Sequence, residues 1–314
     1  MKKEFRNSLL LILTALIWGT AFVAQREGGA EVGPYTFNCI RSLIGAVVLL
    51  PVIKLLEKRT SGETSPNTAD RKTLWVGGIS CGVVLFVAST FQQLGMYYGT
   101  TAGKAGFLTA CYILIVPLLG LFLGKKCHWN VWFSVLIALC GLYFLCLTNG
   151  FTLQLSDGLV LLCAVSFAVH ILVIDHFSPL VDGVRLSCIQ FFVCGVLGLV
   201  PMIGLDMRHS AAGAGLWIAS LGSWDVWLPI LYAGVLSCGV GYTLQVVGQD
   251  GINPTIASLL MSLESVFSVL AGMILLHETM SGRELLGCVL VFAAVLFAQI
   301  PLEKRRHKRE IKKL

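Results

Sequence analysis

An all-α membrane protein with ten transmembrane helices in two inverted five-helix repeats is the fold class that the sequence predicts. The first reason is composition: 56% of the 314 residues are hydrophobic and 13% are charged, against about 25% charged residues in an average soluble domain. The second is that the charges gather between long apolar runs. The third is a weak internal repeat that divides these runs into two sets of five. Water is therefore not the main solvent of this chain.

Ten apolar runs are long enough to span a membrane, because a helix needs about 20 apolar residues to cross the hydrocarbon core. In chain order they are residues 8–25, 35–53, 73–94, 102–123, 129–147, 157–177, 184–205, 225–247, 254–276 and 282–300. The run after Lys2-Lys3 has no small-x-small cleavage site, which favours a first span over a signal peptide. The connections are short and rich in turn-forming residues, so we expect no inserted soluble domain.

The distribution of basic residues predicts that both termini face the cytoplasm. An even number of spans places the two ends on one side, and the loops of that side are rich in lysine and arginine. The opposite loops hold only Arg26, Arg208 and Arg283. Since basic loops stay on the cytoplasmic side, we expect a multi-pass protein of the cell's inner membrane. Residues 303–314 form a basic cytoplasmic tail, whose position favours contact with anionic lipid over nucleic acid.

The two halves of the chain resemble one another. The segment Gln93–Leu123 matches Gln245–Leu275 at seven positions when the sequence is shifted by 152 residues. The rarer matches in this register are Gln93/Gln245, Gly99/Gly251 and Gly120/Gly272. A weaker register of 149 to 150 residues pairs Ala15/Ala164, Cys39/Cys188, Ile40/Ile189, Gly45/Gly195 and Pro51/Pro201. We expect residues 1–150 to form one repeat and residues 151–302 the other.

Five spans in each repeat have a geometric consequence. Because five is odd, the second repeat enters the membrane in the opposite direction from the first. Inverted repeats are typical of secondary transporters, where exchanging two nearly equivalent packings opens a central site to one side and then to the other. The repeat therefore favours transport over a receptor or an enzyme.

Several short motifs, taken in their order along the chain, carry a resemblance to a family. They are the Trp18-Gly19 pair within Ala15–Val23, Pro34-x6-Arg41, Pro117, and Leu263-Glu264 followed by Leu276-His277-Glu278. With ten spans in two halves, the whole chain resembles the EamA-type transporters of the drug/metabolite transporter superfamily. The sequence departs from the family pattern at Ser265 and His277, where proline and glycine are common, and at Phe167-Ala168, which replaces a Trp-Gly pair.

The resemblance implies a function and the place of its site. Members of the family export amino acids, other metabolites or drugs, and related branches carry nucleotide-linked or lipid-linked solutes. The site is expected in a central cavity between two EamA-like repeats. The resemblance does not identify the substrate.

Glu264 and Arg41 are the strongest candidates for function, because a charge at the bilayer centre costs about 2.5–3.5 kcal/mol on insertion scales. Glu264 is a carboxylate near the middle of the ninth span. It is either a structural glutamate, hydrogen-bonded or paired with Arg41 to lock helix packing, or a proton-coupling or substrate-amine site. Arg41 lies about 9 Å inside its span, where its guanidinium binds a substrate carboxylate or has a structural or gating role.

Other polar side chains within the spans are weaker candidates. The predicted cavity-lining or substrate-binding residues, besides Arg41, are Trp18, Gln93, Lys104, Tyr112, Gln190 and Gln245. His170 joins Glu264 as a coupling candidate, since an intramembrane histidine can relay protons. The alternatives are snorkelling for Lys104, one interhelical hydrogen bond for His170, and helix–helix contacts for the amides.

The predicted function is secondary active export of small metabolites, such as amino acids or drug-like compounds, by alternating access. The alternatives are a carrier of a phosphorylated, nucleotide-linked or lipid-linked solute, and a non-transporting membrane assembly subunit. A membrane enzyme is disfavoured, because the histidines lack metal-ligand spacing. ATP-driven pumping is disfavoured, because no Walker-type glycine loop occurs. The expected partners are a small-molecule substrate, the lipid bilayer and a coupling proton, and the sequence leaves a homodimer open. We expect no cofactor, no metal and no nucleic acid.

Overall fold

The computed structural model describes residues 2–59, 68–100, 102–125, 127–146, 154–207, 214–275 and 281–298. Within these ranges the chain forms helices and no strand, as the fold-class prediction requires. Seven of the described helices are long and apolar enough to cross a membrane, and two shorter apolar helices, Trp129–Leu145 and Pro254–Leu270, accompany them. Large apolar side chains such as Phe122 and Val200 are exposed on the outside of the bundle, which suits contact with lipid.

Each predicted span coincides with a helix or with a series of helices broken within the span. The first half contains α1 (Lys2–Val32), α2 (Pro34–Arg59), α3 (Thr68–Tyr97), α4 (Ala102–Ala110), α5 (Tyr112–Phe122) and α6 (Trp129–Cys146). The second contains α7 (Leu155–Phe177), α8 (Gly183–Pro201), the π-helix η1 (Met202–Asp206), α10 (Ala214–Ser220), α11 (Trp224–Leu231), the π-helix η2 (Tyr232–Tyr242), α12 (Thr243–Gln249), α13 (Pro254–Met261), α14 (Glu264–Leu275) and α15 (Gly282–Ala298). The predicted boundary between residues 150 and 151, the tail 303–314 and the His277-Glu278 motif lie outside the described residues.

The fourth and ninth spans are broken at equivalent places, although both are apolar and continuous in the sequence. α4 gives way to α5 at Cys111, and α13 gives way to α14 at 262–263. At the second break the Ser262 hydroxyl donates to the Leu259 carbonyl at 2.8 Å, a bond that competes with the helical ladder. Discontinuous helices at matching positions of two halves often mark the substrate site of a transporter.

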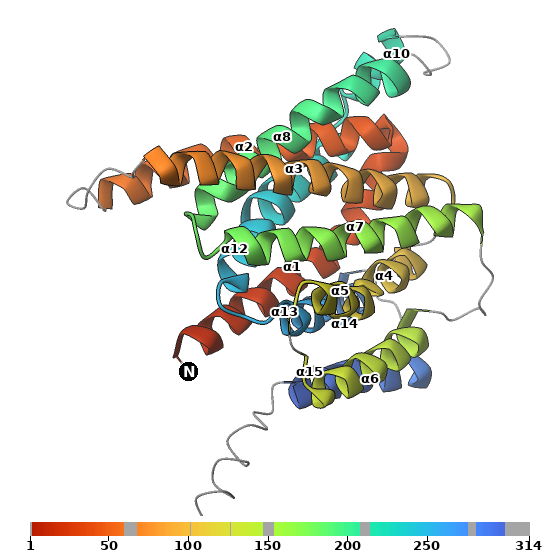
Figure 1. Cartoon of the computed structure of the whole chain (residues 1–314). Coiled ribbons are helices and arrows are strands. Elements are labelled where there is room, and N and C mark those ends of the chain that lie inside the picture. The colour runs from red at the N-terminus through yellow and green to blue at the C-terminus, as the bar shows by residue number, and fades with distance from the viewer. Residues whose placement is uncertain are drawn as a thin grey trace, which may run out of the picture.

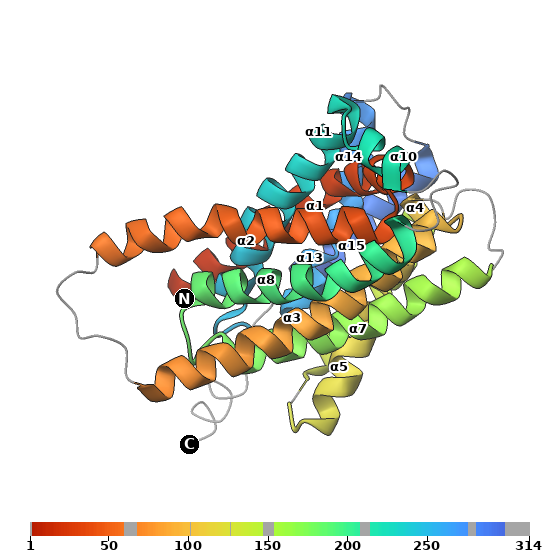
Figure 2. The same ribbon diagram turned by 90° about the horizontal axis from the view of Figure 1, so that it is seen from above.

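The packing of the helices follows the inverted repeat. α1 and α7 are counterparts in the two repeats, as are α3 and α12, and α5 and α14. Accordingly, α7 packs against α3 and α5, and α1 packs against α12 and α14. The counterparts α2 and α8 pack against each other. Figure 2 shows α2, α8, α3 and α7 running side by side. The Cys39 thiol donates to the Gly195 carbonyl at 3.3 Å and the Cys188 thiol to the Ala46 carbonyl at 3.5 Å. The repeat relates these two bonds to each other: a shift of 149 residues takes the donor Cys39 to the donor Cys188 and the acceptor Ala46 to the acceptor Gly195.

The turns and the outer helices repeat in the same way. The matched Gly99 and Gly251 both have positive φ, 115° and 78°, a backbone that favours glycine. α6 and α15 lie together along one edge of the bundle (Figure 1). A Cβ added at Gly141 would lie 2.9 Å from the Gly287 carbonyl, and one at Gly287 would lie 2.7 Å from the Gly141 carbonyl. This mutual close approach explains why both residues are glycine.

α1 passes close to the break between α13 and α14. A Cβ at Gly19 would lie 2.5 Å from the Glu264 carbonyl oxygen and 2.8 Å from Cβ of Phe267. The glycine of the Trp18-Gly19 pair therefore lets α1 approach the start of α14. This contact brings Trp18 and Glu264 to the same region at the centre of the bundle.

Candidate functional site

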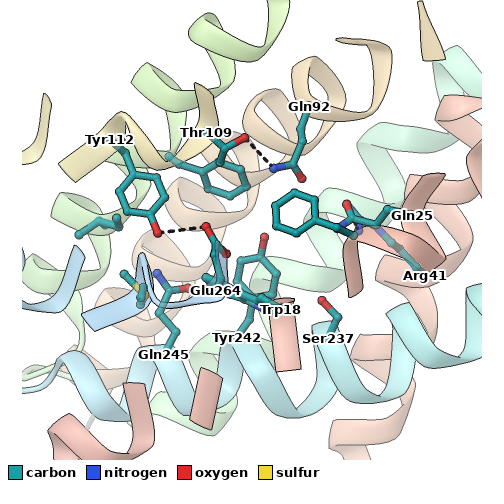
Figure 3. Close-up of a pocket in the computed structure, with 14 residues that line it drawn as sticks. Trp18, Gln25, Arg41, Gln92, Thr109, Tyr112, Ser237, Tyr242, Gln245 and Glu264 are labelled. Atoms are coloured by element: carbon teal, nitrogen blue, oxygen red, sulfur yellow. Dashed lines mark hydrogen bonds between the residues drawn. The ribbon is translucent and has the colours of Figure 1, made fainter. Parts of the chain in front are cut away.

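A cavity lies where helices of both halves meet (Figure 3). The space inside it is about 30 Å³, room for about two water molecules. Its walls are Trp18, Phe22, Gln25, Arg41, Gln92, Thr109, Tyr112, Phe167, Ile171, Ser237, Tyr242, Gln245, Met261 and Glu264. In this conformation that space is smaller than a metabolite.

Much of the lining comes from positions that the repeat relates to one another. The related pairs are Trp18/Phe167 and Phe22/Ile171 in the register of 149 residues, and Thr109/Met261 and Tyr112/Glu264 in the register of 152 residues. Both members of each pair contact the same small space. The cavity therefore lies on the pseudo-two-fold axis of the repeats.

Arg41 lies at one end of the lining, beside Gln25 (Figure 3). Arg41 is 4% exposed as a residue. Its guanidinium donates from Nη1 to Gln25 Oε1 at 2.9 Å and lies 5.4 Å from the centroid of the Phe37 ring. Gln93 Nε2 supports the same turn of α1 by donating to the Gln25 backbone carbonyl at 2.8 Å. Arg41 Nε has no partner among the described residues. Because an unpaired buried donor is costly, this N–H is poised for a ligand or a water molecule.

Glu264 is the first residue of α14, directly after the helix break, and is 3% exposed. Tyr112 Oη donates to Glu264 Oε1 at 3.3 Å, so the hydrogen bond joins equivalent positions of the two repeats. Arg41 bonds to Gln25 whereas Glu264 bonds to Tyr112. Glu264 is therefore hydrogen-bonded rather than paired with Arg41 in this structure, and one cavity presents a guanidinium and a carboxyl group separately.

Aromatic and amide groups from η2 and α12 complete the lining. The Trp18 and Tyr242 rings pack with their centroids 4.5 Å apart. Within the part of the chain that the structure describes, neither Trp18 Nε1 nor Gln245 Oε1 has a hydrogen-bond partner, although both atoms are buried. The lining residues thus carry two unpaired N–H groups, on Trp18 and Arg41, and two oxygen acceptors, on Gln245 and Glu264. This combination suits a small polar ligand.

Four predicted site residues do not line the cavity in this structure: Gln93, Lys104, His170 and Gln190. Gln93 supports α1 from behind Gln25. His170 and Gln190 form a buried pair, with His170 Nε2 and Gln190 Oε1 3.1 Å apart. Trp18, Arg41, Tyr112, Gln245 and Glu264 are the predicted residues that the fold brings together at the cavity.

Lys104 is held away from the cavity by a buried ion pair with Asp157. The Asp157 side chain is fully buried and that of Lys104 is 13% exposed. Asp157 also accepts hydrogen bonds from Thr100 Oγ1 at 2.9 Å and from the Gln154 backbone N–H at 2.7 Å. The carboxylate thus caps the start of α7 and joins it to the turn between α3 and α4 and to α4 itself.

Gln25, Thr109, Ser237 and Tyr242 are polar lining residues that were not among the predicted ones. Gln25 stands at the end of the first predicted span, where a polar residue marks a helix end as often as a site. Tyr242 precedes Gln245 by three residues, and this spacing places the two on one helix face. That spacing is a signal that could have identified Tyr242.

Metal and thiol chemistry find no support in the described part of the chain. There, no group of three or more His, Cys, Asp or Glu side chains could hold a metal ion. The described cysteines are free, and Cys39, Cys163 and Cys238 are buried in the helix packing. They serve as small packing residues, as their positions within apolar runs indicate.

The chain is similar to known proteins along most of its length. The model of the EamA-like transporter family matches residues 6–147 and, a second time, residues 154–299. An uncharacterized transporter of Archaeoglobus fulgidus is 27% identical over 299 residues, with 95% of this chain and 87% of the relative covered. The threonine/homoserine exporter RhtA of Salmonella typhimurium is 24% identical over 299 residues, covering 84% and 96%. A crystal structure of another protein matches with a TM-score of 0.74 and 20% identity over 96% of this chain and 98% of that chain, which shows a common fold.

Proposed function

The chain belongs to the EamA-like transporter family, and on this premise we propose that it exports a small zwitterionic metabolite, an amino acid, by alternating access. The family and the names of the relatives make the protein a multi-pass membrane transporter of a small-molecule substrate. The substrate, the direction and the coupling are our proposal, as are the location in an inner membrane and the cytoplasmic termini.

The observation that carries the proposal is the separate placement of Arg41 and Glu264 in one cavity. A guanidinium binds a carboxylate through parallel hydrogen bonds, and Arg41 Nε is unpaired. A buried carboxylate binds an ammonium group by the same charge-assisted bonding. A zwitterion placed between the two compensates both buried charges at once, which neither a simple amine nor a simple acid can do.

Two further facts support an amino acid over a phosphorylated solute. Of the described lining residues, Arg41 supplies the cationic side chain, because Lys104 pairs with Asp157 away from the cavity. A phosphate ester or nucleotide-linked solute brings two or more negative charges, and these call for more than one cation. A relative that covers most of the chain is named as a threonine/homoserine exporter, which supports both the amino acid and the outward direction.

The small cavity and the inverted repeats support alternating access. The cavity holds about 30 Å³ of space and is lined by residues of both halves, four pairs of which are repeat-related. Exchanging the packing of the two repeats would open it to one side and then to the other.

Glu264→Gln should abolish coupling of efflux to a proton gradient. Glutamine keeps the shape and the hydrogen bond to Tyr112 but cannot exchange a proton. A gradient of one pH unit is worth about 1.4 kcal/mol per proton and supports an about tenfold substrate gradient. We expect wild-type proteoliposomes loaded with labelled L-threonine to release it faster when the outside solution is more acidic than the inside, so that protons enter as threonine leaves. The Glu264→Gln protein should show no such acceleration.

Liposomes without protein and the Glu284→Gln protein are the controls, since Glu284 is a partly exposed residue that caps α15 through Ser281. The Glu284→Gln protein should behave like the wild type. Efflux by folded Glu264→Gln protein that still responds to the gradient would remove the coupling role. Wild-type protein that releases no amino acid faster than empty liposomes would remove the proposed function itself.

A further inference from the structure

The cavity is symmetric at some positions and not at others. Three polar lining residues have repeat counterparts that lie outside the lining: Arg41 corresponds to Gln190, Tyr242 to Thr90, and Gln245 to Gln93. In this structure the lining therefore takes Arg41 from the first repeat and Tyr242 and Gln245 from the second. The matching groups of the opposite repeat are packed away.

Each of these three counterparts has a buried polar atom without a partner among the described residues. The atoms are Nε2 of Gln190, Oγ1 of Thr90 and Oε1 of Gln93. The Gln190 side chain is fully buried and that of Gln93 is 1% exposed. An unpaired buried donor or acceptor costs free energy that packing alone does not repay. Each of these three positions therefore holds a buried polar atom to which another conformation could bring a partner.

His170 extends this hidden group. Its Nε2 lies 3.1 Å from Gln190 Oε1, and its Nδ1 is buried without a described partner. The imidazole contacts the rings of Phe167 and Tyr242, whose centroids lie 6.4 and 6.1 Å away. Both rings line the cavity, so they form the wall between the cavity and the His170–Gln190 pair.

We propose that Gln190, His170 and Gln93 bind the substrate in the state that opens to the opposite face. The inference rests on the proposed alternating access, because it assumes that the two repeats exchange their packings. After that exchange Gln190 occupies the place that Arg41 has now, and Gln93 the place of Gln245. Phe167 and Tyr242 no longer separate His170 from the cavity.

The chemistry of the hidden group fits an amino acid but binds it more weakly. When a neutral His170 donates from Nε2 to Gln190 Oε1, the Gln190 amide keeps its N–H donors and His170 Nδ1 is an acceptor. The amide N–H groups suit the substrate carboxylate, and Nδ1 suits its ammonium or a side-chain hydroxyl. This pair replaces the permanent charge of Arg41 by neutral groups, so the opposite-facing state releases the substrate more readily.

Sided labelling of introduced cysteines tests the inference without any knowledge of the substrate. Gln245→Cys, Gln190→Cys and Gln93→Cys proteins would be treated with a membrane-impermeant methanethiosulfonate in right-side-out and in inverted vesicles. Peptide mass analysis distinguishes each new thiol from the native cysteines. We expect the residue at 245 to react about tenfold faster from one face, and those at 190 and 93 about tenfold faster from the other, because each is accessible in one state only.

Leu142→Cys is the control, because Leu142 is fully buried on α6 and should react from neither face. The inference is overturned if positions 190 and 93, which lie on different helices, both react from the same face as position 245 or from neither face. A position 245 that reacts from neither face would overturn alternating access, and the inference with it. If the labelling gives the expected pattern but the protein transports no amino acid, only the proposed substrate is wrong.

Discussion

Arg41→Ala should weaken binding of the amino acid by about 2–4 kcal/mol, which is about 30- to 1,000-fold in Kd. The guanidinium is buried in the cavity, and the proposed substrate carboxylate would lose its charged donor there. Gln25 Oε1 would also lose its hydrogen bond. Titration calorimetry with detergent-purified protein and L-threonine measures the change.

Two variants make this prediction specific. Arg41→Lys keeps the charge but loses the planar donor fork, so its Kd should fall between those of the wild type and Arg41→Ala. Arg185→Ala removes an arginine from a partly exposed pair with Glu57 on the surface, and its Kd should match the wild type. Unchanged binding by stable Arg41→Ala protein would contradict the role of Arg41.

Asp157→Ala should lower the free energy of unfolding by about 3–5 kcal/mol, the usual cost of leaving one member of a buried ion pair alone. Lys104 would retain a charge that is 13% exposed, and the start of α7 would lose its cap. Unfolding in mixed detergent micelles with increasing sodium dodecyl sulfate measures the loss.

The double variant Lys104→Met/Asp157→Leu should recover part of that loss, since it removes the unpaired charge but does not restore the hydrogen bonds from Thr100 and Gln154. Asp250→Ala is the matched surface control, because its pair with Lys3 is partly exposed and should cost about 1 kcal/mol or less. Equal losses in Asp157→Ala and Asp250→Ala proteins would show that the Lys104–Asp157 pair is not a buried structural element.

The spans and the repeat could be predicted from the sequence because the bilayer restricts what a spanning segment can be. About 20 apolar residues in sequence are both necessary for a span and easy to recognise. The structure supports two of the sequence matches. Gly99 and Gly251 both have positive φ, and Cys39 and Cys188 both donate from their thiols to repeat-related carbonyls. The helix break at Cys111 was not predictable, because the residues around it are apolar or small, whereas the break at 262–263 lies between the polar residues Ser262 and Glu264.

The candidate site was predictable in part for a related reason. Polar residues are rare within the spans, so Arg41, Glu264, Tyr112 and Gln245 stood out, and all of them line the cavity. Which face of a helix meets a neighbour depends on tertiary packing, which one sequence does not reveal. The sequence therefore does not predict that Lys104 pairs with Asp157.

Thermal unfolding with an amino acid and its two blocked forms tests the central claim, that Arg41 and Glu264 bind the two charges of a zwitterion. A ligand at a hundredfold excess over Kd stabilises the folded protein by about 2.7 kcal/mol. We predict that L-threonine raises the unfolding temperature, whereas N-acetyl-L-threonine, which lacks the ammonium, and L-threonine methyl ester, which lacks the carboxylate, do not. The claim that Arg41 and Glu264 bind a zwitterion would be contradicted if all three compounds raised the unfolding temperature equally. It would also be contradicted if neither L-threonine nor any other proteinogenic amino acid raised it.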